Sequence, residues 1–376
     1  MKTVFPEIKK KLGFGGMRFP KREKKIDHEA LCAMIDAFME NGFNYFDTAH
    51  GYHSGNSETA LRECLVKRYP RDSFVLTNKL STFHFEKEEE IRPLFNLQLE
   101  ACGVDYFDFY FMHAQSAALY DKYTKTRAYE IALELMREGK FRHFGISFHD
   151  EAPLLDRILC EHPEIEVVQI QLNYLDYEDA AVQSRKCLEV CQRHGKAVMV
   201  MEPLKGGHLA SPPEDVKRIF DELGDASYAS YAIRFAAGCD SVVSVLSGMS
   251  TLEQVLDNIS YMKDFTPLDE REREAVNAAR DAFLSKNMIS CTACRYCTDG
   301  CPKNISIPDL FACLNSKKIF NDWNADFYYN GVHTVEKGKA SDCIGCAACE
   351  AACPQKLPIR RLLAEVKEEF EKTEKT

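Results

Sequence analysis

Half of the sixteen cysteines in this chain fall into two short runs near its C-terminal end. The runs read CTACRYCTDGCP and CIGCAACEAACP, and both follow the spacing C-x2-C-x2-C-x3-C-P. Three thiolates at this spacing can face three iron corners of one cubane from a single loop, while the fourth points toward a second cubane. The pattern therefore predicts two [4Fe–4S] clusters.

The same spacing divides the eight thiolates into two sets of four. One cluster takes three cysteines of the first run and the last of the second, namely Cys291, Cys294, Cys297 and Cys353. The other cluster takes Cys343, Cys346, Cys349 and Cys301. Structural zinc would need only two CxxC pairs and would leave half of each run unused. The region resembles bacterial two-cluster ferredoxins, with an added insert of about forty residues between the runs whose role the sequence leaves open.

The remaining cysteines are scattered over helix-like segments. Without a signal peptide the chain is expected in a reducing compartment, where isolated cysteines are mostly small buried apolar side chains. We expect this of Cys32, Cys64, Cys102, Cys160, Cys187, Cys191, Cys239 and Cys313.

Composition narrows the possible partners. A formal charge of −10 argues against binding to nucleic acid or to an anionic membrane surface, because both would repel the chain. No apolar stretch approaches the roughly 20 residues that a membrane span needs, and the N-terminal residues do not form a signal peptide. We therefore expect a cytoplasmic protein of 376 residues with one large and one small domain.

Residues 1–285 are expected to form the large domain, and residues 286–376 the small iron–sulfur domain with a terminal helix. In the large domain, short apolar runs alternate with longer amphipathic stretches. Eight such repeats within about 250 residues fit an α/β fold of the (β/α)₈ barrel type. The apolar runs are KLGFGG, FNYFDTA, SFVLTNK, YFDFYFMH, RHFGISF, VVQIQLNY, AVMVMEPL and SVVSVLSG. A doubly wound sheet is the runner-up.

Polar residues follow several of these runs, where a barrel places its chemistry. The strings FDTAHGY, LTNK and FYFMH resemble the catalytic signature of the aldo-keto reductase superfamily over all eight strands. That resemblance implies a catalytic tetrad of Asp47, Tyr52, Lys79 and His113. Relatives that reduce an activated C=C bond carry Glu in place of the histidine, so His113 favours carbonyl reduction.

Elementary chemistry supports the same roles. A carbonyl group that receives hydride at carbon needs a proton at oxygen, and Tyr52 can donate it. The reference pKa of tyrosine is near 10, and we expect the Lys79 ammonium to lower it while Asp47 keeps Lys79 charged. His113 would orient the substrate oxygen.

The resemblance also implies contacts to a nicotinamide cofactor. Ser147 and Gln169 match positions that hold the carboxamide, although Phe148 replaces the usual Asn, and Met201 replaces an aromatic stacking residue. The remaining expected contacts are Pro203, Leu204, Gly206, Gly248, Ser250, Gln254 and Asn258. The Lys and Arg of NADP-specific relatives are missing at Gly248 and Gln254, so NADH and NADPH both stay open.

Three functions are compatible with these two halves. The first is NAD(P)H-linked carbonyl reduction or alcohol oxidation on a small substrate, with clusters that exchange electrons with a ferredoxin, flavodoxin or flavoprotein. The second is an ordinary carbonyl reductase with purely structural clusters, and the third is a non-catalytic electron-transfer or redox-sensing protein. We expect the small domain to pack beside the mouth of the barrel and the last helix to return to the barrel wall.

Overall fold

The computed structural model describes residues 4–286, 289, 291, 293–298, 300–353 and 355–371. Eight parallel strands close into a barrel in the order β1-β10-β9-β8-β7-β6-β5-β4, which confirms the predicted (β/α)₈ fold. The strands are β1 (Leu12–Gly15), β4 (Tyr45–Asp47), β5 (Val75–Leu80), β6 (Phe107–Gln115), β7 (Phe141–Phe148), β8 (Val167–Gln171), β9 (Ala197–Met201) and β10 (Val242–Ser247). A small hairpin, β2 (Lys21–Arg22) and β3 (Lys25–Ile26), follows β1.

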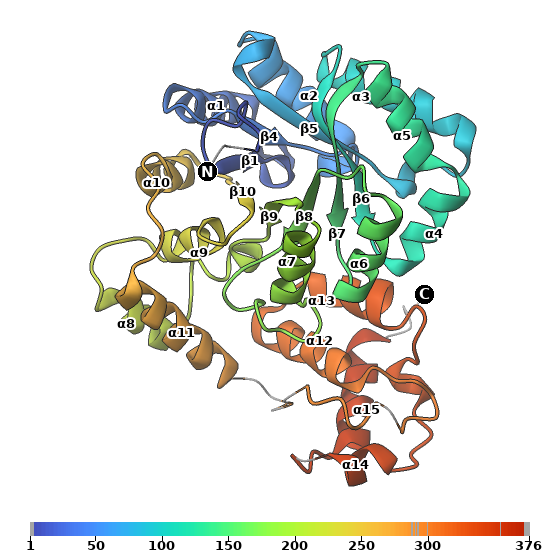
Figure 1. Ribbon diagram of the computed structural model, residues 1–376. Helices are drawn as coiled ribbons and strands as arrows, with labels where there is room; N and C mark the ends of the chain where they lie inside the picture. Colours follow the sequence, from blue (N-terminus) through green and yellow to red (C-terminus); the bar gives the residue numbers. More distant parts are fainter. Residues whose placement is uncertain are drawn as a thin grey trace.

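Helices cover the outside of the barrel (Figure 1). They are α1 (His28–Glu40), α2 (Asn56–Leu61), α3 (Ile91–Cys102), α4 (Ala117–Lys125), α5 (Ala128–Arg137), α6 (Ala152–Glu161), α7 (Ser184–Arg193), α8 (Glu214–Asp221), α9 (Tyr228–Ala237), α10 (Leu252–Met262) and α11 (Glu270–Leu284). Among the described residues, no helix is long and apolar enough to cross a membrane.

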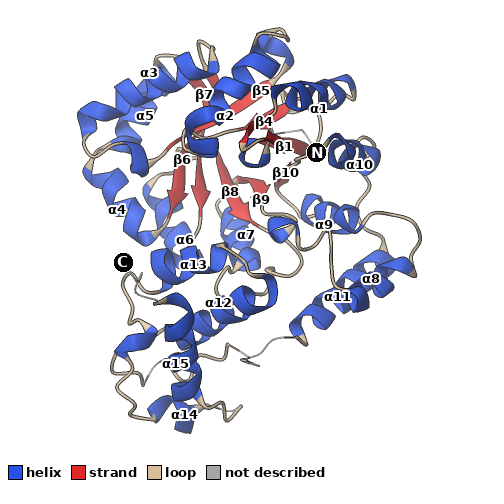
Figure 2. Ribbon diagram, turned by 180° about the vertical axis from the view of Figure 1, so that it is seen from behind, coloured by secondary structure: helices blue, strands red, loops and turns tan. Residues whose placement is uncertain are grey.

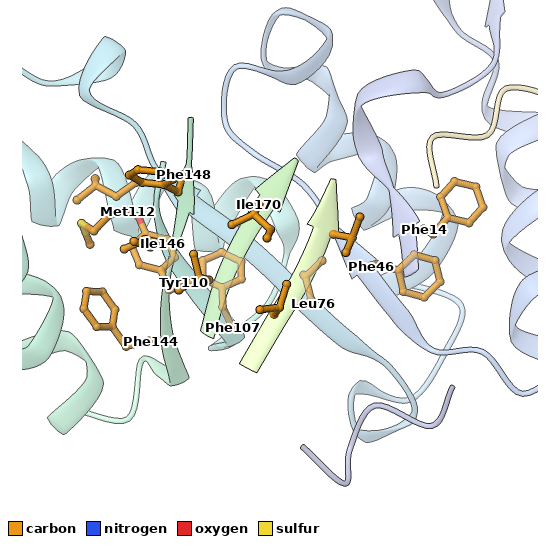
Figure 3. Close-up of a cluster of buried hydrophobic side chains, with 14 of the residues drawn as sticks. Phe14, Phe46, Leu76, Phe107, Tyr110, Met112, Phe144, Ile146, Phe148 and Ile170 are labelled. Carbon is orange, nitrogen blue, oxygen red and sulfur yellow. The ribbon is translucent and has the colours of Figure 1, made fainter. Parts of the chain in front are cut away.

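The main core lies between the strands and these helices. Its outward-facing strand residues include Phe14, Phe46, Leu76, Ile146 and Phe148, all of them buried (Figure 3). Residues of the opposite strand face, such as Phe109 and Phe111, fill the barrel interior. Burial of both strand faces explains why the strands read as continuous apolar runs.

The second domain has its own apolar core. It contains α12 (Ile307–Phe320), α13 (Asn324–Tyr328), α14 (Ala348–Ala352) and α15 (Ile359–Phe370). In both views α12 and α13 lie toward the barrel, and α14 lies at the far end of this domain (Figures 1 and 2). The last helix, α15, packs in this core and ties Glu369 to Lys318 of α12 at 2.8 Å. The expectation that it returns to the barrel wall was wrong, because its apolar face is covered within its own domain.

Candidate active site and cysteine cavities

Three of the four expected tetrad residues form one connected group at the C-terminal ends of neighbouring strands. Asp47 ends β4, and Lys79 lies near the end of β5. The ammonium of Lys79 donates to Asp47 Oδ1 at 2.6 Å, to the Thr48 carbonyl oxygen at 2.9 Å and to Tyr52 Oη at 3.4 Å. Lys79 is completely buried, so the carboxylate and these oxygens replace the water that a charged group would otherwise need.

Tyr52 lies on a short turn after β4 that its neighbour His53 stabilises. His53 has left-handed backbone angles, and its ring stacks on Phe19 with centroids 5.5 Å apart. Its Nε2 also accepts a hydrogen bond from the backbone amide of Phe19 at 3.2 Å. Packing of His53 therefore fixes the turn from which the Tyr52 hydroxyl reaches Lys79.

The fourth tetrad residue, His113, lies near this group on β6. Its ring centroid is 6.0 Å from that of Tyr52, and its Nδ1 is buried without a hydrogen-bond partner among the described residues. Burial, together with Lys79, holds the pKa of His113 well below its usual range. His113 lines the cavity, and a neutral imidazole that carries an N–H there can donate a hydrogen bond to a substrate oxygen.

Burial changes one expectation about this group. Burial raises the pKa of Tyr52 above its ordinary value, although the Lys79 ammonium opposes this rise. Lys79 therefore acts in the expected direction but does not outweigh desolvation. For Lys79, burial alone would lower the pKa, but Asp47 and Tyr52 raise it, and the ammonium stays charged.

A cavity of about 970 Å³ extends from this group across the barrel mouth to the start of α10. Asp47, Tyr52 and His113 line one part of it. Nine of the ten expected cofactor contacts also line it: Gln169, Met201, Pro203, Leu204, Gly206, Gly248, Ser250, Gln254 and Asn258. A Cβ at Gly248 would come within 2.9 Å of the Arg18 side chain, so a larger residue at this position would displace Arg18.

Ser147 is the expected contact that does not line the cavity. Its hydroxyl oxygen accepts a hydrogen bond from the Ala114 amide at 2.8 Å. The adjacent Phe148, which occupies the usual Asn position, points into the outer core (Figure 3). Gln169 lines the cavity and donates to Asp47 Oδ2 at 3.3 Å.

Arg18 also lines the cavity, and no sequence motif marks it as a site residue. Its guanidinium lies 3.8 Å from the Glu202 carboxylate, and its side chain runs between Gly206 and Gly248. Glu202 in turn accepts from the Gly206 amide at 2.6 Å. Arg18 follows a short turn after β1, and only the closed barrel brings that turn beside the loops that follow β9 and β10.

The eight cysteines of the two runs surround two small cavities in the second domain. Cys291, Cys294, Cys297 and Cys353 line the first, and Cys301, Cys343, Cys346 and Cys349 line the second. These groups have the membership that the spacing predicts. Apolar side chains, including Ile305 and Leu363, complete the second cavity.

The backbone around the cavities suits anionic sulfur. The Ile305 amide donates to Cys301 Sγ at 3.5 Å. Ala293, Arg295, Gly345 and Ala347, which lie between the cysteines, all have positive φ. When residues with positive and negative φ alternate, successive backbone amides turn toward one point, as in anion-binding nests. Four thiols and an apolar wall around each cavity are therefore compatible with a [4Fe–4S] cubane.

Comparison with known proteins agrees with this geometry. The family model described as the aldo/keto reductase family matches residues 11–281. The chain belongs to the aldo/keto reductase family. A second family model, described as a 4Fe-4S dicluster domain, matches residues 290–358. The protein is therefore an oxidoreductase of the aldo/keto reductase family that carries a C-terminal 4Fe–4S domain.

Relatives cover the reductase part of the chain. The NADH-specific methylglyoxal reductase of Escherichia coli is 26% identical over 276 residues, which span 61% of this chain and 82% of that protein. L-galactose dehydrogenase of Arabidopsis thaliana is 25% identical and spans 64% of this chain and 80% of that protein. A Bacillus halodurans aldo-keto reductase in its holo form has the same fold, with a TM-score of 0.58 at 24% identity over 72% of this chain and 91% of that one.

The insert between the cysteine runs closes part of the reductase cavity. Trp323, Asn324 and Phe327 line it together with the barrel residues. The preceding residue, Asp322, lies 3.4 Å from Lys205, a buried barrel residue that also donates to Asp176 at 2.6 Å. The sequence left the role of this insert open, because only its long-range contacts place it at the barrel mouth.

The scattered cysteines differ partly from the expectation. Cys102, Cys187, Cys191 and Cys313 are buried as expected, and Cys239 is half-buried. Cys32 and Cys64 instead form a disulfide between α1 and the segment after α2, and Cys160 is exposed. Cys64 is buried as expected, but its pairing with Cys32 was not predicted, because the sequence does not show that the two segments lie side by side. The expectation of burial was wrong for Cys160, because helical periodicity alone does not show which face a neighbouring helix covers.

Proposed function

We propose that this protein reduces a small aldehyde or ketone to an alcohol, or oxidises the alcohol, with a nicotinamide cofactor in the barrel cavity. The observation that carries the proposal is the placement of Lys79 between Asp47 and Tyr52 at the edge of a cavity of about 970 Å³. The charged amine and the neutral phenol are the groups that protonation of a carbonyl oxygen requires.

Each side chain of the site has its own role in carbonyl reduction. A reduced nicotinamide, when bound, would supply the hydride that the carbonyl carbon needs. Tyr52 donates its hydroxyl proton to the carbonyl oxygen, and the charge of Lys79 stabilises the phenolate that remains. His113, kept neutral by burial, hydrogen-bonds the same oxygen and orients it. Met201 and Gln169 would hold the nicotinamide ring, and Ser250 with the N-terminus of α10 would hold a phosphate.

The adenosine end of the cavity favours NADH over NADPH. The lining residues of α10 include the acidic Glu253 and Asp257, and Asp257 accepts from Ser227 at 2.8 Å. Arg18 is the only Lys or Arg among the described lining residues, and Glu202 already lies beside it. A 2′-phosphate would meet carboxylates without a cation to pair with it. The Escherichia coli relative described above as NADH-specific supports the same preference.

We also propose that the two cysteine cavities each hold one [4Fe–4S] cluster, with the four ligands named above for each. Electron relay to an external ferredoxin, flavodoxin or flavoprotein is the second candidate role. It is supported by the second cysteine cavity, where Cys346 and the 60%-exposed Ile344 lie at the surface within reach of a carrier protein.

One anaerobic experiment tests both parts. The purified protein is mixed with NADH or NADPH and a panel of aldehydes and ketones, and its visible spectrum is recorded before and after addition. Consumption of NADH that depends on the carbonyl compound supports the reductase, and its absence with every compound contradicts it. Bleaching of the clusters by NADH alone supports relay, whereas full turnover in a Cys294→Ala variant that has lost a cluster contradicts relay.

A further inference from the structure

The substrate end of the cavity is built by both domains. Phe83, after β5, contributes one aromatic side chain, and the insert of the iron–sulfur domain contributes Trp323 and Phe327. Phe83 is 67% exposed and Trp323 46% exposed, although large apolar side chains are usually buried. Exposed aromatic side chains that gather around one cavity indicate a binding surface for an apolar group.

The insert presents these residues on one face of a short helix. Trp323 directly precedes α13, and Phe327 lies within it. Because the two residues are four positions apart, their side chains lie on the same side of the helix. Ala325 and Tyr328, on the other side, are buried in the core of the iron–sulfur domain. Trp323 therefore lines the reductase cavity, and Phe327 lines it while also packing against the core of its own domain.

Several contacts fix this helix against the barrel. Asp322 lies 3.4 Å from the Lys205 ammonium, and the ring of Phe320 lies 5.3 Å from that of His208. Farther along the insert, Lys337 donates to Glu151 at 2.7 Å. The ring of Phe327 contacts that of His149 at 5.4 Å, directly after β7. These contacts hold the aromatic face beside the catalytic group.

Charge narrows the substrate class. His113 and His149 are neutral, since burial lowers the pKa of His149 to about 4 and that of His113 well below its usual range. Arg18, beside Glu202, lies on the loops assigned to the cofactor. Among the described lining residues, no free cation faces the substrate end, which disfavours a carboxylate or phosphate on the substrate. Phe83, Trp323 and Phe327 give this end three large aromatic side chains, which favours a substrate with an apolar body.

We infer that the substrate is an uncharged carbonyl compound with a flat apolar body, and that Trp323 and Phe327 of the iron–sulfur domain select it. This inference builds on the proposed reductase function. The iron–sulfur domain thereby completes the substrate site, whether or not its clusters relay electrons.

A substrate panel with matched variants tests this selection in the intact holoprotein. Benzaldehyde should show a higher kcat/KM than 4-carboxybenzaldehyde, glyceraldehyde or acetaldehyde. Trp323→Ala and Phe327→Ala should each raise the KM for benzaldehyde by roughly three- to tenfold, the loss of one aromatic contact, and should raise the KM for acetaldehyde by a clearly smaller factor. Trp323→Phe should restore most of the loss. Val335→Ala, an exposed change elsewhere in the insert, is the control.

A binding measurement gives a readout that does not need turnover. Trp323 is the single tryptophan of the chain, so intrinsic tryptophan fluorescence reports on this wall alone. Benzyl alcohol, added to the protein with NADH so that no reaction occurs, should change this emission with saturation. Unchanged emission, preference for an anionic or polyol carbonyl compound, or an equal loss with all substrates in the variants would overturn the inference. If no carbonyl compound is reduced at all, the reductase proposal fails and this inference fails with it.

Discussion

The ammonium of Lys79, completely buried near the end of β5, lies 3.4 Å from the hydroxyl of Tyr52, which is half-buried in the turn after β4. In this position the charge of Lys79 stabilises the phenolate form of Tyr52, while burial disfavours it, and burial is the larger effect. The proton therefore stays on Tyr52 at neutral pH, where carbonyl reduction needs it.

The pH dependence of the two reaction directions follows from this balance. Reduction uses the protonated phenol, and the folded pKa of Tyr52 is raised, so kcat for reduction should stay level up to about pH 10 and fall only above it. Alcohol oxidation uses the phenolate and should keep rising through the same range. In Lys79→Met the pKa of Tyr52 should rise further, so oxidation near pH 9 should drop roughly 100-fold. A pH–rate profile of both directions checks this; a profile that Lys79→Met leaves unshifted would contradict it.

Removal of the phenol should separate chemistry from binding. We expect Tyr52→Phe to lower kcat for reduction by about 10²- to 10⁴-fold, the usual contribution of a positioned acid, with NADH affinity kept within about twofold. Stopped-flow turnover and quenching of Trp323 emission by NADH measure the two effects. Tyr106→Phe, at the opposite end of the barrel beside Arg142, serves as the control and should change neither.

Cofactor preference should follow the carboxylates of α10. We predict a kcat/KM for NADH at least about tenfold above that for NADPH, and a double variant Glu253→Lys, Gln254→Arg that gains about tenfold with NADPH, as one new charge pair provides. Steady-state kinetics with both cofactors checks this. Equal use of the two cofactors by the unmodified protein would be inconsistent with the acidic lining that motivates the prediction.

The two cysteine groups make a prediction about iron content. Cys353→Ala and Cys297→Ala, 56 positions apart in the chain but on one cavity, should lose the same cluster and share one electron paramagnetic resonance spectrum. Cys301→Ala and Cys349→Ala should lose the other cluster. Iron per chain should fall from about eight to about four in each case. Cys160→Ala, on the exposed surface of the barrel, should keep all of it.

The link between the domains should contribute strongly to stability. Lys205 is 4% exposed and lies beside both Asp176 and Asp322, so Lys205→Met leaves two buried carboxylates without their cation. We expect a loss of about 3–5 kcal/mol in the free energy of unfolding, measured by urea titration under argon. Lys125→Met removes an exposed pair with Asp121 and should cost less than about 1 kcal/mol. Similar losses in both variants would show that the interdomain pair is not important.

Much of this protein could be predicted from its sequence. The eight strands, the order of the tetrad and the membership of the two cysteine groups all depend on short-range spacing, which the chain displays directly. Gly42, Gly139 and Gly195, which follow helices α1, α5 and α7, have positive φ, as expected for residues that end helices. Patterns of this kind depend on residues that are close in the chain, so they can be recognised before the fold is known.

Other features depended on contacts between distant segments. Arg18 reaches Glu202 across the barrel mouth, and Cys32 pairs with Cys64. The insert brings Trp323 and Phe327 to the cavity that His113 also lines. The direction of the Tyr52 pKa shift was likewise decided by burial, which is a property of the whole packed barrel. The sequence by itself determined which chemistry the chain carries. The tertiary structure decided which side chains surround it, because desolvation and long-range contact exist only once the domains have packed together.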